Sequence, residues 1–166
     1  TSDEPLTVAQ NLPDIDGMVI VTKPQDVALL DSRKSITFAN SLKVDVIGVI
    51  ENMSGYTIRG KAPAGAEIEL AAPGGKTVKA QADSDGNWAG TLDIFKSGGG
   101  EKTANEFNVP FLGKLPFDPG FVRGGDDGVH RIVSEPDGPS SEAFSKVVAK
   151  IQERVCLLYT SDAADE

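Results

Sequence analysis

Two short apolar runs with a helical segment between them constrain the fold more than any other feature of this sequence. Residues 17–22 and 44–50 are almost continuously apolar, as expected for strands that are buried on both faces of a sheet. Between them, residues 26–42 predict a helix with Val27, Leu30 and Ile36 toward the sheet. Strand, helix and strand in this order form a right-handed crossover between parallel strands. The sequence therefore predicts an α/β fold.

A different periodicity occupies the middle of the chain. Four short segments are separated by clusters of glycine, proline and aspartate, and they lie at 56–59, 67–71, 77–82 and 87–92. Apolar and polar residues alternate in them, which predicts antiparallel strands with one solvated face. We expect residues 56–93 to form a small β-rich insert closed around Trp88. The Gly-Asn-Trp at 86–88 resembles the last strand of a bacterial Ig-like repeat.

The α/β pattern returns at residue 94. A glycine-rich start predicts a helix from residue 99 or 100 to 107, and the apolar run 109–115 predicts a third strand. A loop with glycines at 124, 125 and 128 is expected next. An amphipathic helix over 140–155 ends the predicted fold.

The last residues, 156–166, show neither helical nor strand periodicity. They resemble the translation of a sequencing adapter, and the other interpretation is a disordered acidic end. In both cases we expect them to lie outside the fold. The chain has one cysteine, Cys156, and one histidine, His130. One residue of each type cannot form a disulfide or a Cys/His metal site within the chain, so no metal site is predicted.

The charge of the chain excludes one class of partner. The formal net charge is -9, and an acidic surface repels phosphate backbones, so no nucleic-acid partner is expected. No apolar run approaches the roughly 20 residues of a membrane-spanning helix, and the first residues lack the pattern of a signal peptide. We therefore expect a soluble, cytoplasmic protein without a membrane partner.

Six segments in a fixed order carry a resemblance to one family, and they lie at 1–7, 21–31, 48–55, 98–102, 109–119 and 125–128. Among them are Glu-Asn-Met-Ser-Gly and Val-Pro-Phe-Leu-Gly-Lys-Leu-Pro-Phe-Asp-Pro. They are similar to segments of Mrp/ApbC-type iron–sulfur cluster carrier ATPases, which are MinD-like P-loop NTPases. The resemblance implies that 1–55 and 94–155 form the C-terminal part of a mostly parallel P-loop NTPase sheet flanked by helices. The phosphate-binding loop itself is expected upstream, so the chain is expected to be a fragment.

The resemblance also implies a nucleotide site. Asn52 matches the family asparagine that reads the adenine edge, and an amide offers both a donor and an acceptor to a purine. Pro116 and Asp118 fall in the loop that packs on the other side of the base. From the residues alone, a cap of a strand-end turn is the more common role of an asparagine such as Asn52. ATP is the expected cofactor, with Mg²⁺ in the full-length protein, and no catalytic residue is assigned in this chain.

The chain departs from the family at the iron–sulfur site. The family has Cys-x-x-Cys soon after Asn-Met-Ser-Gly, whereas here Tyr-Thr-Ile-Arg occupies 56–59 and the insert follows. Clusters need thiolate ligands, and none of these side chains supplies one. We therefore do not expect a cluster to be carried at this position.

Two further motifs imitate ligand loops. The glycine-rich segment 97–103 fails the spacing of a phosphate loop because Glu101 precedes Lys102, so a helix start is predicted there. The segment 83–87 has its glycine too early for a calcium loop and is predicted to be a hairpin turn. His130 has no recognisable catalytic partner and is expected at the surface.

Three functions are compatible with these observations. The first is a fragment of an ATP-binding iron–sulfur cluster carrier ATPase, inactive alone, homodimeric when full length and serving iron–sulfur client proteins. The second is a partner-binding β-module on an ATPase scaffold. The third is a MinD/ParA-like positioning ATPase, which the segments at 98–102 and 109–113 fit less well.

Overall fold

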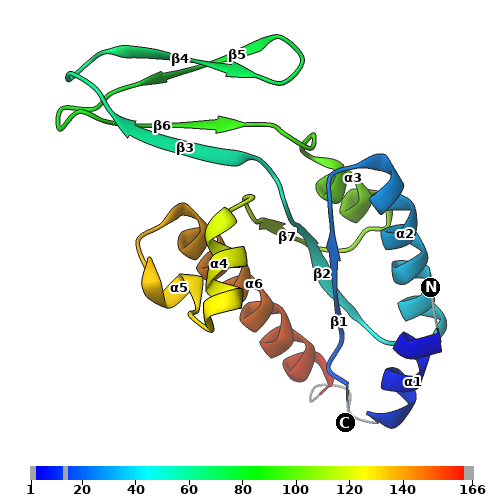
Figure 1. The fold of residues 1–166 in the computed structure, drawn as a ribbon. Helices are drawn as coiled ribbons and strands as arrows, with labels where there is room; N and C mark the ends of the chain where they lie inside the picture. The colour runs from blue at the N-terminus through cyan, green and yellow to red at the C-terminus, as the bar shows by residue number, and fades with distance from the viewer. Residues whose placement is uncertain (1–2, 13–14, 163–166) are drawn as a thin grey trace.

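The structure is a computed structural model that describes residues 3–12 and 15–162, with side chains described over 5–12 and 15–158. Its centre is a three-stranded sheet in the order β1-β2-β7 (Figure 1). The strands β1, β2 and β7 span Met18–Thr22, Val46–Glu51 and Phe111–Lys114, and all of them are parallel. Each strand overlaps the apolar run that predicted it. The predicted α/β fold with a parallel sheet is confirmed.

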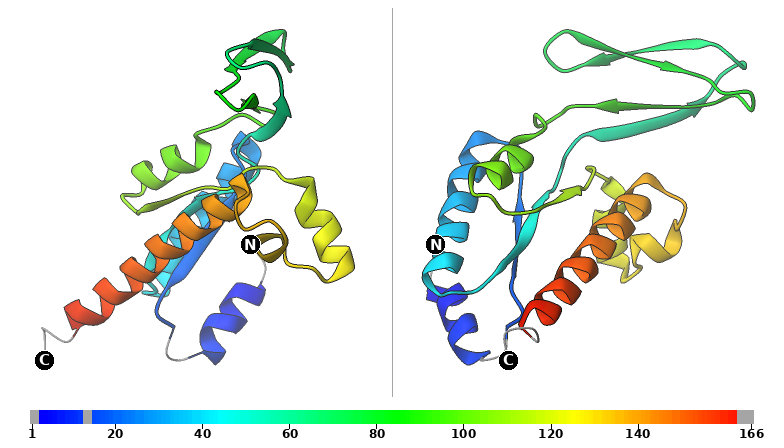
Figure 2. Two further views of the ribbon diagram at one scale, coloured as in Figure 1. Left: turned by 90° about the vertical axis from the view of Figure 1, so that its left-hand side faces the viewer. Right: turned by 180° about the vertical axis from the view of Figure 1, so that it is seen from behind.

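Helices cover both faces of this sheet. Helices α2 (Asp26–Ser41) and α3 (Gly99–Glu106) pack on one face, and α6 (Pro139–Asp162) packs on the other (Figures 1 and 2). The core beneath α2 and α3 contains Ile20, Ile36, Val49 and Ala104. The prediction that Val27 and Leu30 face the sheet was wrong, because they are 78% and 56% exposed. The buried face of α2 is instead the helical stripe of Leu29, Ser32, Ile36 and Ala39. The core beneath α6 contains Ile47, Ile50, Leu112, Leu115 and Val147. A further helix, α1 (Asp3–Asn11), precedes β1.

The middle of the chain forms two antiparallel strand pairs. Strand β3 (Tyr56–Lys61) pairs with β6 (Asn87–Leu92), and β4 (Glu67–Ala72) pairs with β5 (Lys76–Gln81). We call residues 56–92 the β-ribbon. In Figure 1 it leaves the sheet at the end of β2 and extends beyond it, above the side on which α4 and α5 lie.

The two strand pairs of the β-ribbon pack against each other. Trp88, Gly90 and Leu92 alternate with exposed residues along β6 and face inward. Leu70 of the other pair lies directly over Gly90, where its Cδ1 would be 2.5 Å from an added Cβ. Trp88 is only half-buried, whereas Leu92 is 8% exposed. The predicted alternation is therefore confirmed, and Gly90 and Leu92 are more enclosed than Trp88.

A helix replaces the loop predicted around the glycines at 124–128. Helix α4 spans Pro119–Asp127, and a short α5 (Arg131–Ser134) follows. The loop prediction was wrong because both ends of α4 carry specific signals. Asp118 caps its first turn, and Gly128 ends it with a φ of 68°, a left-handed conformation that suits glycine.

The tail predicted to lie outside the fold is also partly wrong. Helix α6 continues to Asp162, and Leu158 packs against the core beneath it. The reason is that Val155 and Leu158 are three residues apart, so they extend the apolar stripe of the helix. Residues 163–166 lie outside the described residues. Within residues 3–12 and 15–162, none of the helices combines the length and apolar character that crossing a bilayer requires.

Candidate functional site

The carboxyl ends of the parallel strands meet at one edge of the sheet. The Asn52 N–H, just after β2, donates to the Thr22 carbonyl at the end of β1 over 2.7 Å. The Leu115 N–H, just after β7, donates to the Glu51 carbonyl over 2.8 Å. Ligands of open parallel sheets bind outside the carboxyl ends of the strands. This edge is therefore the candidate site.

Asn52 sits in a tight turn at this edge. Its Oδ1 accepts a hydrogen bond of 2.8 Å from the Met53 N–H, and Met53 has a φ of 56°. Non-glycine residues seldom adopt this left-handed conformation, and they cluster in turns and at functional sites. This bond caps the turn, which is the role expected from the residues alone. The Asn52 amide still has a second lone pair on its oxygen and two N–H donors that a ligand can use. Capping and ligand recognition by Asn52 are thus compatible.

A groove of about 600 Å³ opens beside Asn52, between β1 and α2. Its polar lining includes Thr22, Lys23, Gln25 and Ser32, and its apolar lining includes Val19, Val21, Val27 and Ala28. The volume is in the range of small-molecule sites, and such sites combine apolar walls with a few polar groups. The lining also includes Asp31, and the apolar walls at Val21 and Val27 are largely exposed, so the groove is open to solvent.

The segment with Pro116 and Asp118 runs beside the turn that holds Asn52. The Ser54 N–H donates to the Leu115 carbonyl over 2.9 Å, and the Phe117 N–H donates to the Gly55 carbonyl over 2.7 Å. However, Pro116 and Asp118 line a smaller pocket of about 130 Å³ with the start of β3. The structure thus brings the two segments together but opens their side chains to different cavities. Their action on one base stays a prediction.

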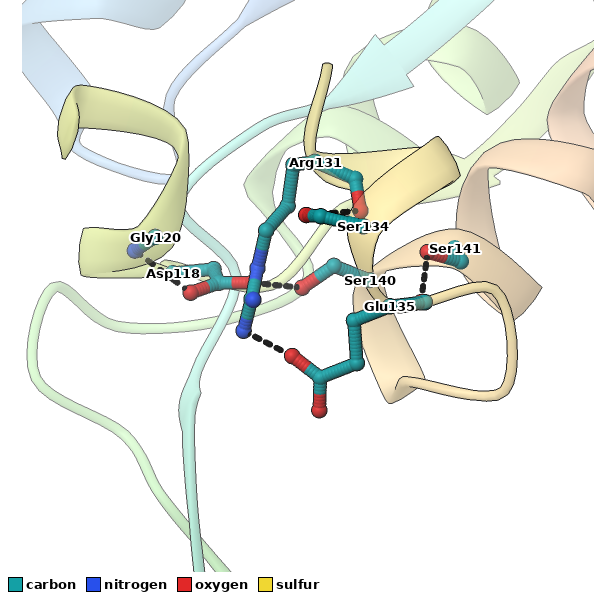
Figure 3. A network of polar contacts seen from close by, with 7 residues as sticks. All are labelled: Asp118, Gly120, Arg131, Ser134, Glu135, Ser140 and Ser141. Carbon is teal, nitrogen blue, oxygen red and sulfur yellow. Dashed lines mark hydrogen bonds and ion pairs between the residues drawn. The ribbon is translucent and has the colours of Figure 1, made fainter. Parts of the chain in front are cut away.

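The carboxylate of Asp118 is the centre of a polar network (Figure 3). It accepts hydrogen bonds from the Gly120 N–H at 2.7 Å, from Arg131 Nε at 2.9 Å and from Ser140 Oγ at 2.7 Å. Arg131 also pairs with Glu135. These contacts join the starts of α4 and α6 to α5, so the network fixes the loop that follows β7.

The contacts of Asp118 lower its pKa. Burial alone raises the pKa of this carboxyl, but the hydrogen bonds from Arg131, Ser140 and the Gly120 N–H outweigh burial and hold it below its usual value. In return, the hydrogen bond to Asp118 raises the pKa of Arg131. Asp118 is therefore an ionised carboxylate that holds the starts of α4, α5 and α6 together.

Asp118→Asn should destabilise the chain by about 1–2 kcal/mol at neutral pH, because hydrogen bonds to a charged acceptor are lost. The folded pKa lies below the unfolded value of about 3.9. The carboxylate therefore stabilises the fold above that pH, and the stabilisation is lost as pH falls through the folded pKa. Urea unfolding at a series of pH values should show the wild type and the variant converging in acid. Asp126→Asn, at an exposed carboxyl of α4, is the matched control. A difference that stays constant with pH would contradict this role.

Glu51 and Arg131 are two site residues that sequence reasoning did not single out. Glu51 is fully buried at the end of β2, directly before Asn52. An acidic residue that ends an otherwise apolar strand was the signal available for Glu51. Arg131 offered no comparable signal, because its partners are distant in sequence. His130 precedes α5 and is exposed, as predicted.

The residues of this chain do not fit an iron–sulfur cluster. A cluster requires about four cysteine thiolates, and the chain has one cysteine, Cys156. It lies in the C-terminal part of α6, which is at the opposite end of the sheet from β3 (Figure 1). Among the residues that the structure describes, no three His, Cys, Asp or Glu side chains are grouped to hold a metal ion.

Comparison with known proteins agrees with this architecture. The sequence matches the ParA family, described as NUBPL iron-transfer P-loop NTPase, over residues 1–84 and 84–152. It is 39% identical over 155 residues to an iron-sulfur cluster carrier protein of Methanocaldococcus jannaschii, covering 93% of this chain and 43% of that protein. It is 36% identical over 157 residues to one of a Synechocystis species, covering 95% and 37%. The chain thus spans less than half the length of these relatives.

Solved structures share the fold. The cell division ATPase MinD of Pyrococcus furiosus superposes with a TM-score of 0.51 at 18% identity, covering 83% of this chain and 43% of that one. The septum site-determining protein MinD of Pyrococcus horikoshii, complexed with Mg-ADP, gives 0.52 at 17% identity, covering 86% and 44%. At this identity the likeness concerns the fold alone. The family match and the carrier relatives together establish that the chain belongs to the ParA family of NUBPL iron-transfer P-loop NTPases.

Proposed function

We propose that this chain supplies the base-reading part of an ATP-binding iron–sulfur cluster carrier ATPase. The observation that carries the proposal is the position of Asn52 at the carboxyl end of the central strand, where it lines the groove between β1 and α2. The names of the relatives, which are iron-sulfur cluster carrier proteins, support the carrier assignment.

An asparagine amide suits adenine better than guanine. Adenine presents an acceptor and a donor side by side, N7 and N6–H₂, whereas guanine presents two acceptors, N7 and O6. The Asn52 amide can pair with both adenine groups while its oxygen keeps the bond to the Met53 N–H through the other lone pair. The 166 residues contain no Gly-x-x-x-x-Gly-Lys-Ser/Thr segment. Phosphate and Mg²⁺ binding, and hence hydrolysis, are therefore proposed to need other parts of a longer protein.

Asn52→Ala should weaken the binding of adenosine and remove the preference over guanosine. Losing hydrogen bonds to a base costs about 1–3 kcal/mol, which corresponds to roughly 5- to 150-fold in affinity. Chemical-shift titration of the ¹⁵N-labelled chain measures this directly. We expect adenosine to shift the signals of Asn52, Thr22 and Ser54, and guanosine to shift them less.

The matched control is Asn40→Ala, which alters an exposed asparagine near the end of α2. It should leave adenosine binding unchanged. Equal responses to adenosine and guanosine in the wild type, or an unchanged response in Asn52→Ala, would remove Asn52 from the proposed site.

The partners of the longer protein are also a proposal. We infer that the longer protein is a homodimer, as the family resemblance implies. We also infer that it serves iron–sulfur client proteins, which is compatible with relatives named iron-sulfur cluster carrier proteins. A second candidate function is partner binding by an insert at 56–93. It is supported by the β-ribbon, which projects from the edge of the sheet with exposed outer residues (Figure 1). A positioning role like that of MinD has less support, because the MinD structures share only 17–18% identity with this chain.

A further inference from the structure

The β-ribbon is connected to the parallel sheet by two loop segments, an entry and an exit, that lie close together. Its entry is the turn 52–55 after β2, and its exit is the segment 93–98 before α3. Both segments contain residues in the left-handed conformation, with φ values of 56° at Met53 and 71° at Lys96. Segments of this kind need contacts from the surrounding structure to hold them.

One buried side chain contacts the entry and the exit together. Glu51 is 0% exposed, and its Oε1 accepts a hydrogen bond of 2.5 Å from Ser54 Oγ at the entry. The same Oε1 accepts a bond of 3.0 Å from the Gly98 N–H at the exit. Its Oε2 accepts a bond of 2.6 Å from the Gly100 N–H in the first turn of α3. A single carboxylate thus joins the central strand, both ends of the β-ribbon and a helix.

The local sequence is shaped around this carboxylate. A Cβ added at Gly100 would lie 2.9 Å from Glu51 Cβ and 3.3 Å from Oε2, so a side chain there would displace it. Gly98 takes a φ of 89°, which turns the chain into α3. The N–H groups at the start of a helix favour an anion, and here that anion is part of the protein. This explains why the glycine-rich segment 97–103 is not a phosphate loop.

An aromatic contact supports the same junction. Phe117 packs edge-on against Tyr56, at 5.8 Å between ring centroids, and against Phe95, at 6.0 Å. These rings contact the two ends of the β-ribbon. The exit and α3 are also held by the exposed ion pairs Lys96–Asp26 and Lys114–Glu101, but exposed pairs contribute little to stability. Glu51 is the buried carboxylate that bonds to the backbone of both the exit and α3.

We propose that Glu51 is a positioning residue that fixes the orientation of the β-ribbon relative to the parallel sheet. Through its neighbour Asn52 it also places the ribbon at a set position beside the candidate base site. The link to a nucleotide rests on the proposed function, whereas the orientation of the ribbon does not.

The test uses Glu51→Gln in the nucleotide-free, ¹⁵N-labelled 166-residue chain. Glutamine keeps the shape but has one acceptor oxygen, so its NH₂ group must face the Gly98 or the Gly100 N–H. The amide of at least one of these glycines should exchange with solvent about tenfold faster or more, since a bond to a charged acceptor is lost. Residual dipolar couplings of the ribbon and the sheet should fit one alignment tensor in the wild type and two in the variant.

If Glu51 only stabilises the fold, Glu51→Gln should lower Tm but leave a single alignment tensor. The amide exchange of Gly98 and Gly100 should then also be unchanged. That result would overturn the proposal. Glu106→Gln is the matched control, because this carboxylate pairs with Arg33 between α2 and α3, away from the ribbon. It should keep one tensor. If Glu51→Gln does not fold, Ser54→Ala removes the bond from Ser54 to Glu51 at the entry, together with the longer contact of 3.5 Å between Ser54 and Ser97. Two tensors in Ser54→Ala would support the proposal, and one tensor would contradict it. Failure of adenosine to bind would leave all of these outcomes unaffected.

Discussion

Anaerobic reconstitution with iron and sulfide is expected to leave the 166-residue chain without a bound iron–sulfur cluster after desalting. Cluster irons are held by cysteine thiolates, and the start of β3 presents Tyr56, Thr57, Ile58 and Arg59 instead. Hydroxyl, aliphatic and guanidinium groups do not replace thiolates. Iron and sulfide assays on the desalted chain, together with the visible absorbance spectrum, measure the outcome.

Two controls test whether retained iron is bound by Cys156 and whether the reconstitution works. Cys156 is exposed on α6 and can bind iron loosely, so Cys156→Ser should behave like the wild type after desalting. A carrier relative treated in parallel should retain its cluster and show that the procedure works. A stable charge-transfer absorbance that persists in Cys156→Ser would mean that this chain holds a cluster through other ligands.

The parallel sheet was predictable from local sequence. The run 44–50 is apolar because helices cover both faces of β2, whereas β1 is covered by α2 on one face and leaves Val21 59% exposed on the other. The β-ribbon was predictable for the opposite reason. Its strands bury only one face, so inward Leu70 and Leu92 alternate with exposed neighbours. The spacing of apolar residues along a strand shows how many of its faces are buried, because successive side chains point to opposite faces. Both patterns therefore predicted the type of sheet.

The helices after β7 were harder to predict. Three glycines between 124 and 128 favoured a loop, yet α4 forms because its cap, Asp118, is itself held by Arg131 and Ser140. Those partners are 13 and 22 residues away in sequence. The end of α6 was missed for a simpler reason. The polar residues that follow hid the spacing of Val155 and Leu158, which continues the stripe onto the core.

The candidate site was predictable in part. Asn52 lies at the carboxyl edge of the sheet as the resemblance implied, and the segment with Pro116 and Asp118 runs beside it. The direction of each side chain was not predictable, because it depends on contacts between segments. The buried carboxylate of Glu51 is the clearest example. Its three donors come from Ser54 and from glycines 47 and 49 residues further along the chain.

Central to the proposed function is that this chain contacts the base of a nucleotide but not its phosphates. The chain has no phosphate loop, whose backbone N–H groups and lysine cradle the phosphates. Its net charge of -9 further disfavours a triphosphate. The triphosphate should therefore add nothing to affinity, and ATP should bind no more tightly than adenosine, at about the millimolar level.

Titration of the wild-type chain with adenosine and with ATP, followed by calorimetry or by the chemical shift of the Asn52 side chain, tests this claim most directly. We predict dissociation constants for the two ligands that agree within about threefold, with no ATP hydrolysis over the course of the titration. Micromolar affinity for ATP, with weak binding of adenosine, would show that the chain contains a phosphate site and would contradict the account.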